Sequence, residues 1–346
     1  MRTARIVEAG AAYYHVLSRV VDRRFVFDEG EKERFRKTMR QVEGFTGCEI
    51  RTYAILSNHW HVLLYVPERQ EITDGELGRR MGLLYDKTVV ETVLGSLARL
   101  RETGNVAAAE SLKSQYTRRM YKLSEFGKML KQRVSLSYNK RHGRKGTLWE
   151  ERFKSVLLEG AGALKATAAY IDLNAVRAKL VEDPCDYRFC GYGEAMGGSA
   201  EARKGLEQVM REGDAPESWT AASARYRELL YVTGESKGLT VEGKPVRPGF
   251  SYEAVQAVLD QKGRLTLAEV LRCRVRYFTD GAILGSRAFV EDAFLRHRGH
   301  FSVKRETGAR RLSGAEWGGR VCRASTAAGC DRDSRDVVTV LLVVDN

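Results

Sequence analysis

Two histidines, His59 and His61, lie two residues apart in an otherwise apolar stretch, IRTYAILSNHWHVLLYV, at residues 50–66. In a β-strand successive side chains point to opposite faces, so both imidazoles would share one face, with Cα atoms roughly 6.6 Å apart. Trp60 would then point to the other face, which can pack on helices. Two neutral imidazoles at this spacing can bind one divalent cation if a third ligand comes from elsewhere. An isolated H-x-H is more often a pair of polar residues on the solvent-exposed face of an antiparallel strand. A metal site is therefore indicated only if another part of the chain supplies further ligands.

A second group of reactive residue types follows about a hundred residues later, at Tyr170, Asn174 and Arg177. Their i, i+4, i+7 spacing places them on one face of a helix predicted over residues 162–181. A tyrosine hydroxyl has a pKa near 10 and is a weak nucleophile at neutral pH. A helix tyrosine by itself is more often a core or rim residue. Together with an amide and a guanidinium, however, it forms a surface suited to phosphoryl transfer.

The composition limits the classes of partner. The chain has 346 residues, a net charge of +13 and a pI of about 9.5, which favours a polyanion such as nucleic acid. A basic ribosomal or membrane-surface protein would share that charge. No C-x-x-C pair or zinc-finger spacing occurs among the six cysteines, which indicates free thiols in a reducing compartment. Without a signal-like or membrane-spanning apolar run, we expect a cytoplasmic, nucleoid-associated protein with no membrane partner.

The elements that must position these residues follow from the hydrophobic pattern. Their predicted order is β-α-β-β-α-β-α: a strand at 12–20, a helix from 28 to 47, two strands within 50–66, a helical insertion at 67–144, a strand at 152–158 and the helix at 162–181. Within the insertion, residues 102–110 (ETGNVAAAE) are expected to form a loop. His15 lies on the first strand, where we expect an ordinary half-buried residue.

A basic segment with interleaved aromatic residues, residues 116–145, closes the insertion. Charge of one sign beside aromatic rings suits a surface that follows phosphates and stacks unpaired bases, although a charge run is usually only a solvated face. The predicted DNA contacts come from this segment, the next strand and the tyrosine helix: Arg118, Arg119, Lys122, Lys131, Arg133, Lys140, Arg141, Arg144, Lys145, Arg152, Lys154 and Arg177.

Three stretches in this order resemble the single-tyrosine transposases of the HUH superfamily, namely the insertion-sequence and REP-associated tyrosine transposases. They are His59-Trp60-His61, GTLWEERFKS at 146–155 and AAYIDLNAVRAKLVEDPCDYRF at 168–189, and the resemblance covers roughly residues 12–192. Two departures are Ala175, where relatives usually have proline, and the long helical insertion.

The resemblance implies an α+β fold, a ferredoxin-like or RRM-like antiparallel sheet with helices on one face. It also implies that His59, His61 and Asn174 bind Mg²⁺ or Mn²⁺ and that Tyr170 attacks DNA to form a 5′-phosphotyrosine. The inferred substrate is single-stranded, hairpin-bearing DNA, and a homodimer is left open.

The domain division expected from these patterns has four parts. Residues 1–195 form the catalytic domain with its insertion at about 68–145, and 196–250 form a linker with a short helix. Residues 251–300 form a mainly helical domain, either a helix-turn-helix or a packing unit. Its third helix, near residue 290, is expected to follow a glycine turn at 279–285 with Ser286 as its cap. Residues 301–346 are unassigned, apart from a strand expected at 337–344. Two other functions stay open: a nucleic-acid-binding regulator that has lost cleavage, and hydrolysis by metal-activated water, which is weaker because no carboxylate lies beside the two histidines in sequence.

Overall fold

The computed structural model describes residues 5–160, 162–211, 218–234, 237–239, 245–247, 279, 281–303, 305–311 and 320–323. Its strands are β1 (Ala12–Arg19), β2 (Glu49–Ile55), β3 (His59–Val66), β4 (Lys154–Leu158), β5 (Lys237–Leu239), β6 (Pro245–Arg247), β7 (Gly281–Gly285), β8 (Arg310–Arg311) and β9 (Arg320–Arg323). Its α-helices are α1 (Glu29–Thr46), α2 (Asp74–Met81), α3 (Lys87–Glu102), α4 (Val106–Thr117), α5 (Leu123–Arg141), α6 (Gly162–Asp172), α7 (Asn174–Arg177), α8 (Gly191–Met196), α9 (Ala200–Met210), α10 (Trp219–Gly234) and α13 (Arg287–Arg296). Short 3₁₀ turns are η1 (Val21–Arg23), η2 (Pro184–Asp186) and η4 (Arg298–His300).

The centre of the fold is a sheet in which β2, β3, β1 and β4 lie side by side and are antiparallel to their neighbours. This order, reached by the β-α-β-β-α-β sequence, is that of a ferredoxin-like sheet, so the predicted α+β class is confirmed. β7 extends the sheet by pairing parallel to β4, and β9 and β8 follow at the edge. The two histidines therefore lie on β3, an inner strand.

Helices cover both faces of this sheet, so the one-sided arrangement implied by the resemblance is wrong. On one face Trp60 packs against Phe35 of α1, with ring centroids 5.9 Å apart. On the other face Thr52 of β2 donates a hydrogen bond to Asp172 of α6, at 2.9 Å. Both faces of β3 carry buried side chains, Trp60, Val62 and Leu64 on one and His61 and Leu63 on the other, and a buried face needs a covering layer to exclude water.

Helix α1 begins and ends where its sequence signals predict. The carboxylate of Asp28 accepts a hydrogen bond from the Glu31 amide at 2.7 Å, which caps the N-terminus. Gly47 ends the helix with a φ of 69°, a left-handed conformation that favours glycine. These caps fix the chain direction between β1 and β2.

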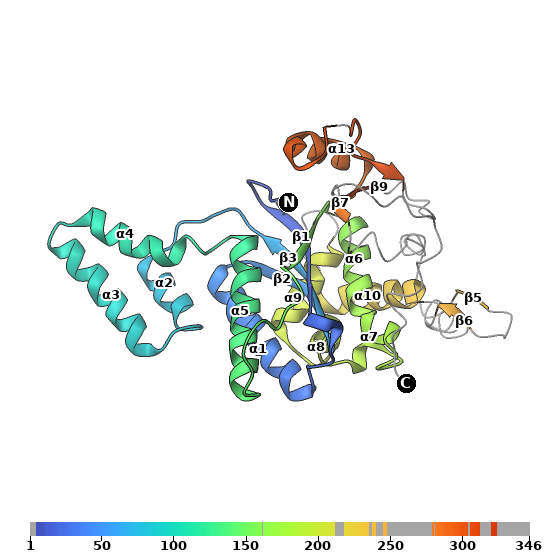
Figure 1. Ribbon diagram of the computed structural model, residues 1–346, viewed down its shortest axis with the longest axis horizontal. Helices are drawn as coiled ribbons and strands as arrows, with labels where there is room; N and C mark the ends of the chain where they lie inside the picture. The colour runs from blue at the N-terminus through green and yellow to red at the C-terminus, as the bar shows by residue number, and fades with distance from the viewer. Residues whose placement is uncertain are drawn as a thin grey trace.

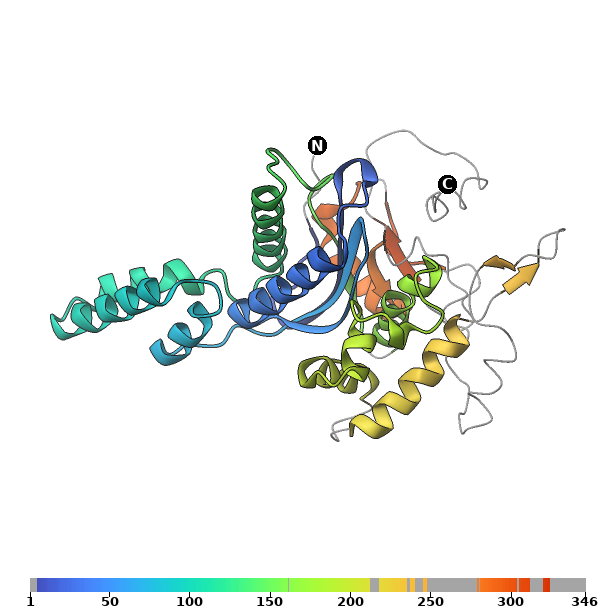
Figure 2. The ribbon, with the colours of Figure 1, turned by 90° about the horizontal axis from the view of Figure 1, so that it is seen from below.

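The helical insertion has two structural parts. Helices α2, α3 and α4 form an arm that projects from the body of the molecule, whereas α5 packs beside α1 (Figures 1 and 2). At the base of the arm, Arg80 donates to the Tyr121 hydroxyl at 2.8 Å. The loop expected at 102–110 is shorter than predicted, because Asn105 caps α4 and the alanines that follow are strong helix formers.

The described residues of the region expected as a linker with a short helix include two helices, α9 and α10. Helices α9 and α10 pack on the body, and the Tyr226 hydroxyl of α10 donates a hydrogen bond to the buried Asp172 carboxylate of α6. Burial raises the pKa of Asp172 to about 6. The expected helix near residue 290 is confirmed as α13 with Ser286 as its cap, but residues 281–285, expected as a turn, form β7.

The other expected helices of the 251–300 unit and the strand expected at 337–344 lie outside the described residues. No helix within the described part of the chain is long and apolar enough to cross a membrane.

Candidate functional site

Three histidines meet on the face of the sheet that α6 covers. His59 and His61 lie on β3 with ring centroids 5.1 Å apart. His15 of β1 approaches His61, with His15 Nε2 and His61 Nδ1 2.9 Å apart. Because β1 pairs with β3 so that Leu17 faces His61, His15 takes the diagonal position on the same face.

The expectation that His15 is an ordinary half-buried residue is therefore wrong, since its side chain is fully buried and hydrogen-bonded to a candidate ligand. The pairing of the first and third strands in a ferredoxin-like sheet could have suggested the neighbour. The register that makes it diagonal to His61 cannot be read from periodicity.

Asn58 fixes the orientation of His59. Its Nδ2 donates to the Arg23 carbonyl at 3.0 Å, and its Oδ1 lies 2.6 Å from His59 Nδ1. Since Oδ1 can only accept, Nδ1 of His59 carries the proton and Nε2 keeps its lone pair for a ligand. His61 is held in the same way when its Nδ1 donates to His15. The spacing of His59 and His61 in the sequence does not reveal this role of Asn58.

Both candidate ligands are held neutral by their surroundings. Burial, with a smaller contribution from the charge of Arg19, lowers the pKa of His59 to about 4. Burial also lowers the pKa of His61 well below its usual value, and the neighbouring histidines act in the same direction. Neutral imidazole is the form that binds a metal ion.

Tyr170 of α6 lies at the edge of this group. Its ring centroid is 5.8 Å from that of His61 and 5.9 Å from that of His15, and its side chain is 3% exposed. The predicted helix at 162–181 is broken after Tyr170: α6 ends at Asp172 and α7 begins at Asn174. The break occurs although Ala175 replaces the proline of the resembling proteins.

Side chains on α7 take over the hydrogen bonds at this break. The Tyr170 carbonyl accepts from Asn174 Nδ2 at 3.0 Å and from Arg177 Nη1 at 2.8 Å. The Arg177 guanidinium also lies over the Tyr170 ring, 4.9 Å from its centroid. The predicted face of Tyr170, Asn174 and Arg177 is thus present, and it holds the tyrosine in position.

The donor set fits a cation that takes two imidazoles and one oxygen. His59 and His61 each have Nδ1 engaged, which leaves Nε2 for the ion. The amide nitrogen of Asn174 is used on backbone carbonyls, so only its Oδ1 can contribute. Within the described ranges no three His, Cys, Asp or Glu side chains form a metal-binding group, and the two histidines with Asn174 stay a prediction.

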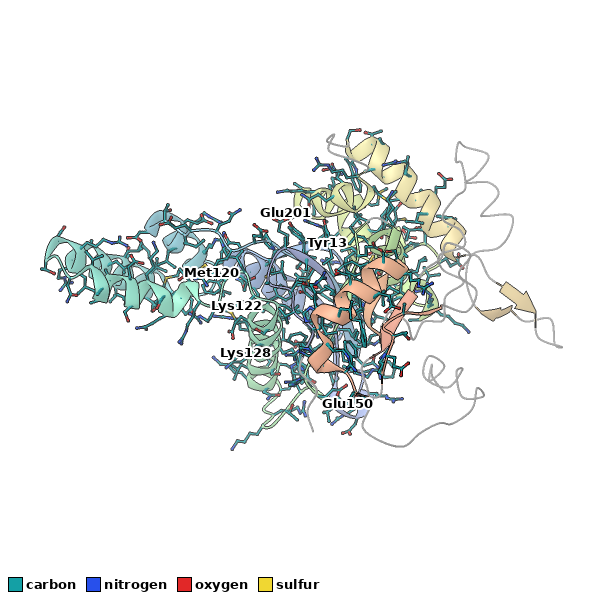
Figure 3. The ribbon with its side chains drawn as sticks, turned by 90° about the horizontal axis from the view of Figure 1, so that it is seen from above. Tyr13, Met120, Lys122, Lys128, Glu150 and Glu201 are labelled. Carbon is teal, nitrogen blue, oxygen red and sulfur yellow. The ribbon has the colours of Figure 1, made fainter. Side chains whose placement is uncertain are left out.

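The predicted DNA contacts fall into two groups in the structure. The exposed side chains are Arg118, Lys122, Lys140, Arg141, Lys145, Arg152 and Lys154, and Figure 3 labels Lys122 where the arm meets the body. The others are partly buried: Arg119, Lys131, Arg133, Arg144 and Arg177.

Several of these side chains also have internal partners. Arg119 lies over three aromatic rings, and Arg133 donates to the Leu84 carbonyl at 3.3 Å. Burial lowers the pKa of Lys131 to about 8. Arg141 forms an ion pair with Glu31. The side chains most available to a phosphate are therefore Arg118, Lys122, Lys140 and Lys145.

Comparison with known proteins finds a family match for the N-terminal part of the chain. Residues 9–75 match the family described as IS200-like transposases; this range includes His15, Asn58, His59 and His61 and ends before Tyr170. A solved structure of the REP-associated tyrosine transposase bound to a REP hairpin is similar over 64% of this chain and 96% of its own, with 14% identity and a TM-score of 0.38. No match was found among curated proteins.

Proposed function

We propose that this chain, whose residues 9–75 match the IS200-like transposase family, cleaves and rejoins single-stranded, hairpin-bearing DNA with Tyr170 as the nucleophile. The observation that carries the proposal is the meeting of His61 and Tyr170 from elements 109 positions apart in the sequence, with ring centroids 5.8 Å apart. The packing of α6 across the sheet brings the two together. The inferred partner is DNA, and Mg²⁺ or Mn²⁺ is the inferred cofactor.

In the proposed reaction the Tyr170 hydroxyl oxygen attacks the scissile phosphorus. A bond forms between that oxygen and phosphorus, the bond from phosphorus to the 3′ oxygen breaks, and the phenolic proton passes through solvent to the leaving 3′ oxygen. The product is a 5′-phosphotyrosine and a free 3′-hydroxyl. The reverse step, with the 3′-hydroxyl of another strand as the attacking group, rejoins the DNA without an external energy source.

The protein side chains orient the reacting groups in this scheme. Asn58 and His15 hold the imidazoles of His59 and His61, and Arg177 holds the tyrosine ring and its carbonyl. Such fixed geometry lowers the entropic cost of the attack. When bound by His59, His61 and Asn174, a divalent cation would polarise the scissile phosphate and offset the charge that develops on it.

One observation favours the alternative of a DNA-binding regulator without cleavage. The Tyr170 side chain is only 3% exposed, and a nucleophile must contact phosphorus. The same surface could bind a hairpin while the tyrosine stays covered. The two functions differ in a single product, the covalent protein–DNA adduct.

The test is adduct formation on a denaturing gel, with labelled hairpin oligonucleotides that carry unpaired flanks. We expect the wild type to form the adduct with Mn²⁺ and to lose it in a chelator. Tyr170→Phe should bind the same DNA with unchanged affinity and form no adduct. Binding by the wild type without any adduct or nick would select the regulator instead.

A further inference from the structure

A loop that the proposed chemistry does not use lies directly beside the histidines. This β1–α1 loop, residues 20–28, contains Arg23, Arg24 and Phe25, all exposed. Phe25 is 63% exposed, and among the described residues it is the only Phe, Tyr or Trp in the exposed class. An aromatic side chain of this size is normally at least partly buried.

The backbone of the loop is held in an uncommon conformation. Asp22 and Arg23 both have positive φ angles, 56° and 54°, which L-residues adopt at a cost of order 1 kcal/mol each. Two consecutive residues of this kind persist only where the surroundings fix them. They turn the chain so that Arg23, Arg24 and Phe25 face solvent while Phe27 returns to the core.

One side of the loop is fixed to the turn that carries the candidate ligand. The amides of Val26 and Phe27 donate to the Ser57 carbonyl at 2.9 and 3.0 Å, and the Val20 amide donates to the Asn58 carbonyl at 2.8 Å. The Asn58 side chain bridges the Arg23 carbonyl and His59 Nδ1. The backbone on both sides of Phe25 is thus fixed to the turn that precedes His59.

The other side of the loop contacts the basic segment and the residues that directly follow it. The Val21 amide donates to the Leu148 carbonyl at 3.1 Å, and Phe27 lies against Tyr138, with ring centroids 6.3 Å apart. Neither Arg23 nor Arg24 forms an ion pair with a described residue. The loop therefore lies between the basic end of α5 and His59.

We propose that Phe25 is a stacking residue for an unpaired base next to the cleaved phosphate, with Arg23 and Arg24 binding the flanking phosphates. A strand that follows the basic segment toward His59 would pass this loop. An exposed aromatic ring beside two exposed guanidinium groups matches the alternating bases and phosphates of single-stranded DNA. The inference rests on the proposed function and specifies what the site binds: a strand that is unpaired at this position.

The test compares two hairpins, one with unpaired flanks and one blunt, in the Tyr170→Phe background so that binding is measured without cleavage. We expect Phe25→Ala to lose affinity for the flanked hairpin by roughly 10- to 100-fold, the effect of one base–aromatic stack. Its affinity for the blunt hairpin should stay unchanged. Phe25→Trp should keep the affinity and Phe25→Leu should not, which separates stacking from apolar contact.

Leu295→Ala is the matched control, because Leu295 is 67% exposed and lies on α13, at the opposite end of the molecule from the loop (Figure 1). A fluorescent adenine analogue placed at each unpaired position in turn should be quenched at one position by the wild-type ring and not by Phe25→Ala.

The Phe25→Ala variant and its Tyr170→Phe parent could bind the flanked hairpin with equal affinity while the wild type still forms the adduct. That result would overturn the stacking role and leave the proposed function standing. Equal losses on both hairpins would also overturn it and indicate a general contact of the loop. If the wild type neither binds nor cleaves any hairpin, the proposed function fails and the stacking role fails with it.

Discussion

The arm and the segment that follows it belong to one insertion in the sequence, yet they differ in charge and in position. Residues 74–117, which form the arm, contain six acidic and six basic side chains, whereas residues 118–145 contain one acidic and ten basic. The second segment thus carries +9 of the chain's net +13. Its helix α5 packs beside α1, while the arm projects away from the body (Figure 2). If the proposed function holds, we therefore expect the second segment, and not the arm, to contact DNA.

Most basic side chains of the arm form ion pairs with acidic side chains of the arm. Asp74 forms ion pairs with Arg101 and Lys113, and Glu76 pairs with Arg79 and Arg80. A neutral surface with internal pairing produces no long-range field for a polyanion. Equal contributions of the arm and the second segment to DNA binding would contradict the expectation that only the second segment attracts DNA.

The largest expected effect comes from neutralising the basic segment. The triple variant Lys122→Gln, Lys140→Gln and Lys145→Gln removes three exposed charges. If each contacts one phosphate, the slope of log affinity against log salt should fall by about 2, and affinity at physiological salt by roughly 50-fold. Binding to labelled single-stranded hairpins across a salt series measures both.

The matched arm variant is Arg79→Gln, Lys87→Gln and Arg99→Gln, which removes the same number of charges. It should leave the salt slope unchanged. Equal slopes for the two triple variants would show that the field is spread over the whole insertion and that the arm serves DNA as well.

A smaller effect, on stability, is expected at the seam, the contact between the arm and the basic segment around Gly47. Gly47 ends α1 with positive φ, and a Cβ there would meet the side chains of Arg80 from the arm and Tyr121 from the basic segment. Gly47→Ala should lower the free energy of unfolding by about 1–2 kcal/mol, through backbone strain and displacement of these side chains. Urea unfolding measures it.

Gly95→Ala is the control for this variant. Gly95 lies in α3, and a Cβ added to it would meet no heavy atom within 4 Å, so the same substitution should stabilise by up to about 1 kcal/mol. A destabilised Gly95→Ala, or a neutral Gly47→Ala, would contradict the packing described for the seam.

The smallest effect should follow removal of the outer arm. The rings of Tyr85 and Tyr116 lie against each other at its base, with centroids 5.9 Å apart, so residues 88–113 can be replaced by a short glycine-serine linker. We expect hairpin affinity and the rate of adduct formation to change by less than about 3-fold, because no charge of the basic segment is removed. A loss as large as that of the lysine triple variant would assign DNA contacts to the arm.

The central strands and the two ends of α1 could be predicted from the sequence because their signals are local. The alternation around Trp60, the cap at Asp28 and the glycine at position 47 each act within a few residues. Chemistry that depends on register was not predicted: His15 reaches His61 only because β1 and β3 pair with a particular offset. The helix break after Tyr170 was missed for a similar reason, since side chains of Asn174 and Arg177 replace a backbone bond that periodicity assumes.

The charged residues show the same limit. Composition identified a basic segment but could not separate exposed side chains such as Lys140 from Arg119 and Arg133, which are partly buried against aromatic rings and a carbonyl. Burial of these cations depends on how the arm packs on α1 and α5. Strand β7 was also hidden, because its five residues pair with β4 over a sequence distance that no local pattern reports.

Formation of a covalent bond between Tyr170 and DNA is the step on which the proposed function depends, and mapping the adduct tests it. The wild-type adduct formed on a hairpin with Mn²⁺ would be digested with protease and nuclease, and its peptides identified by mass spectrometry. We predict one modified peptide, in which Tyr170 carries a 5′-linked nucleotide. A nucleotide on another tyrosine, such as Tyr138 of the basic segment, or cleavage with no modified peptide, would rule out Tyr170 as the nucleophile.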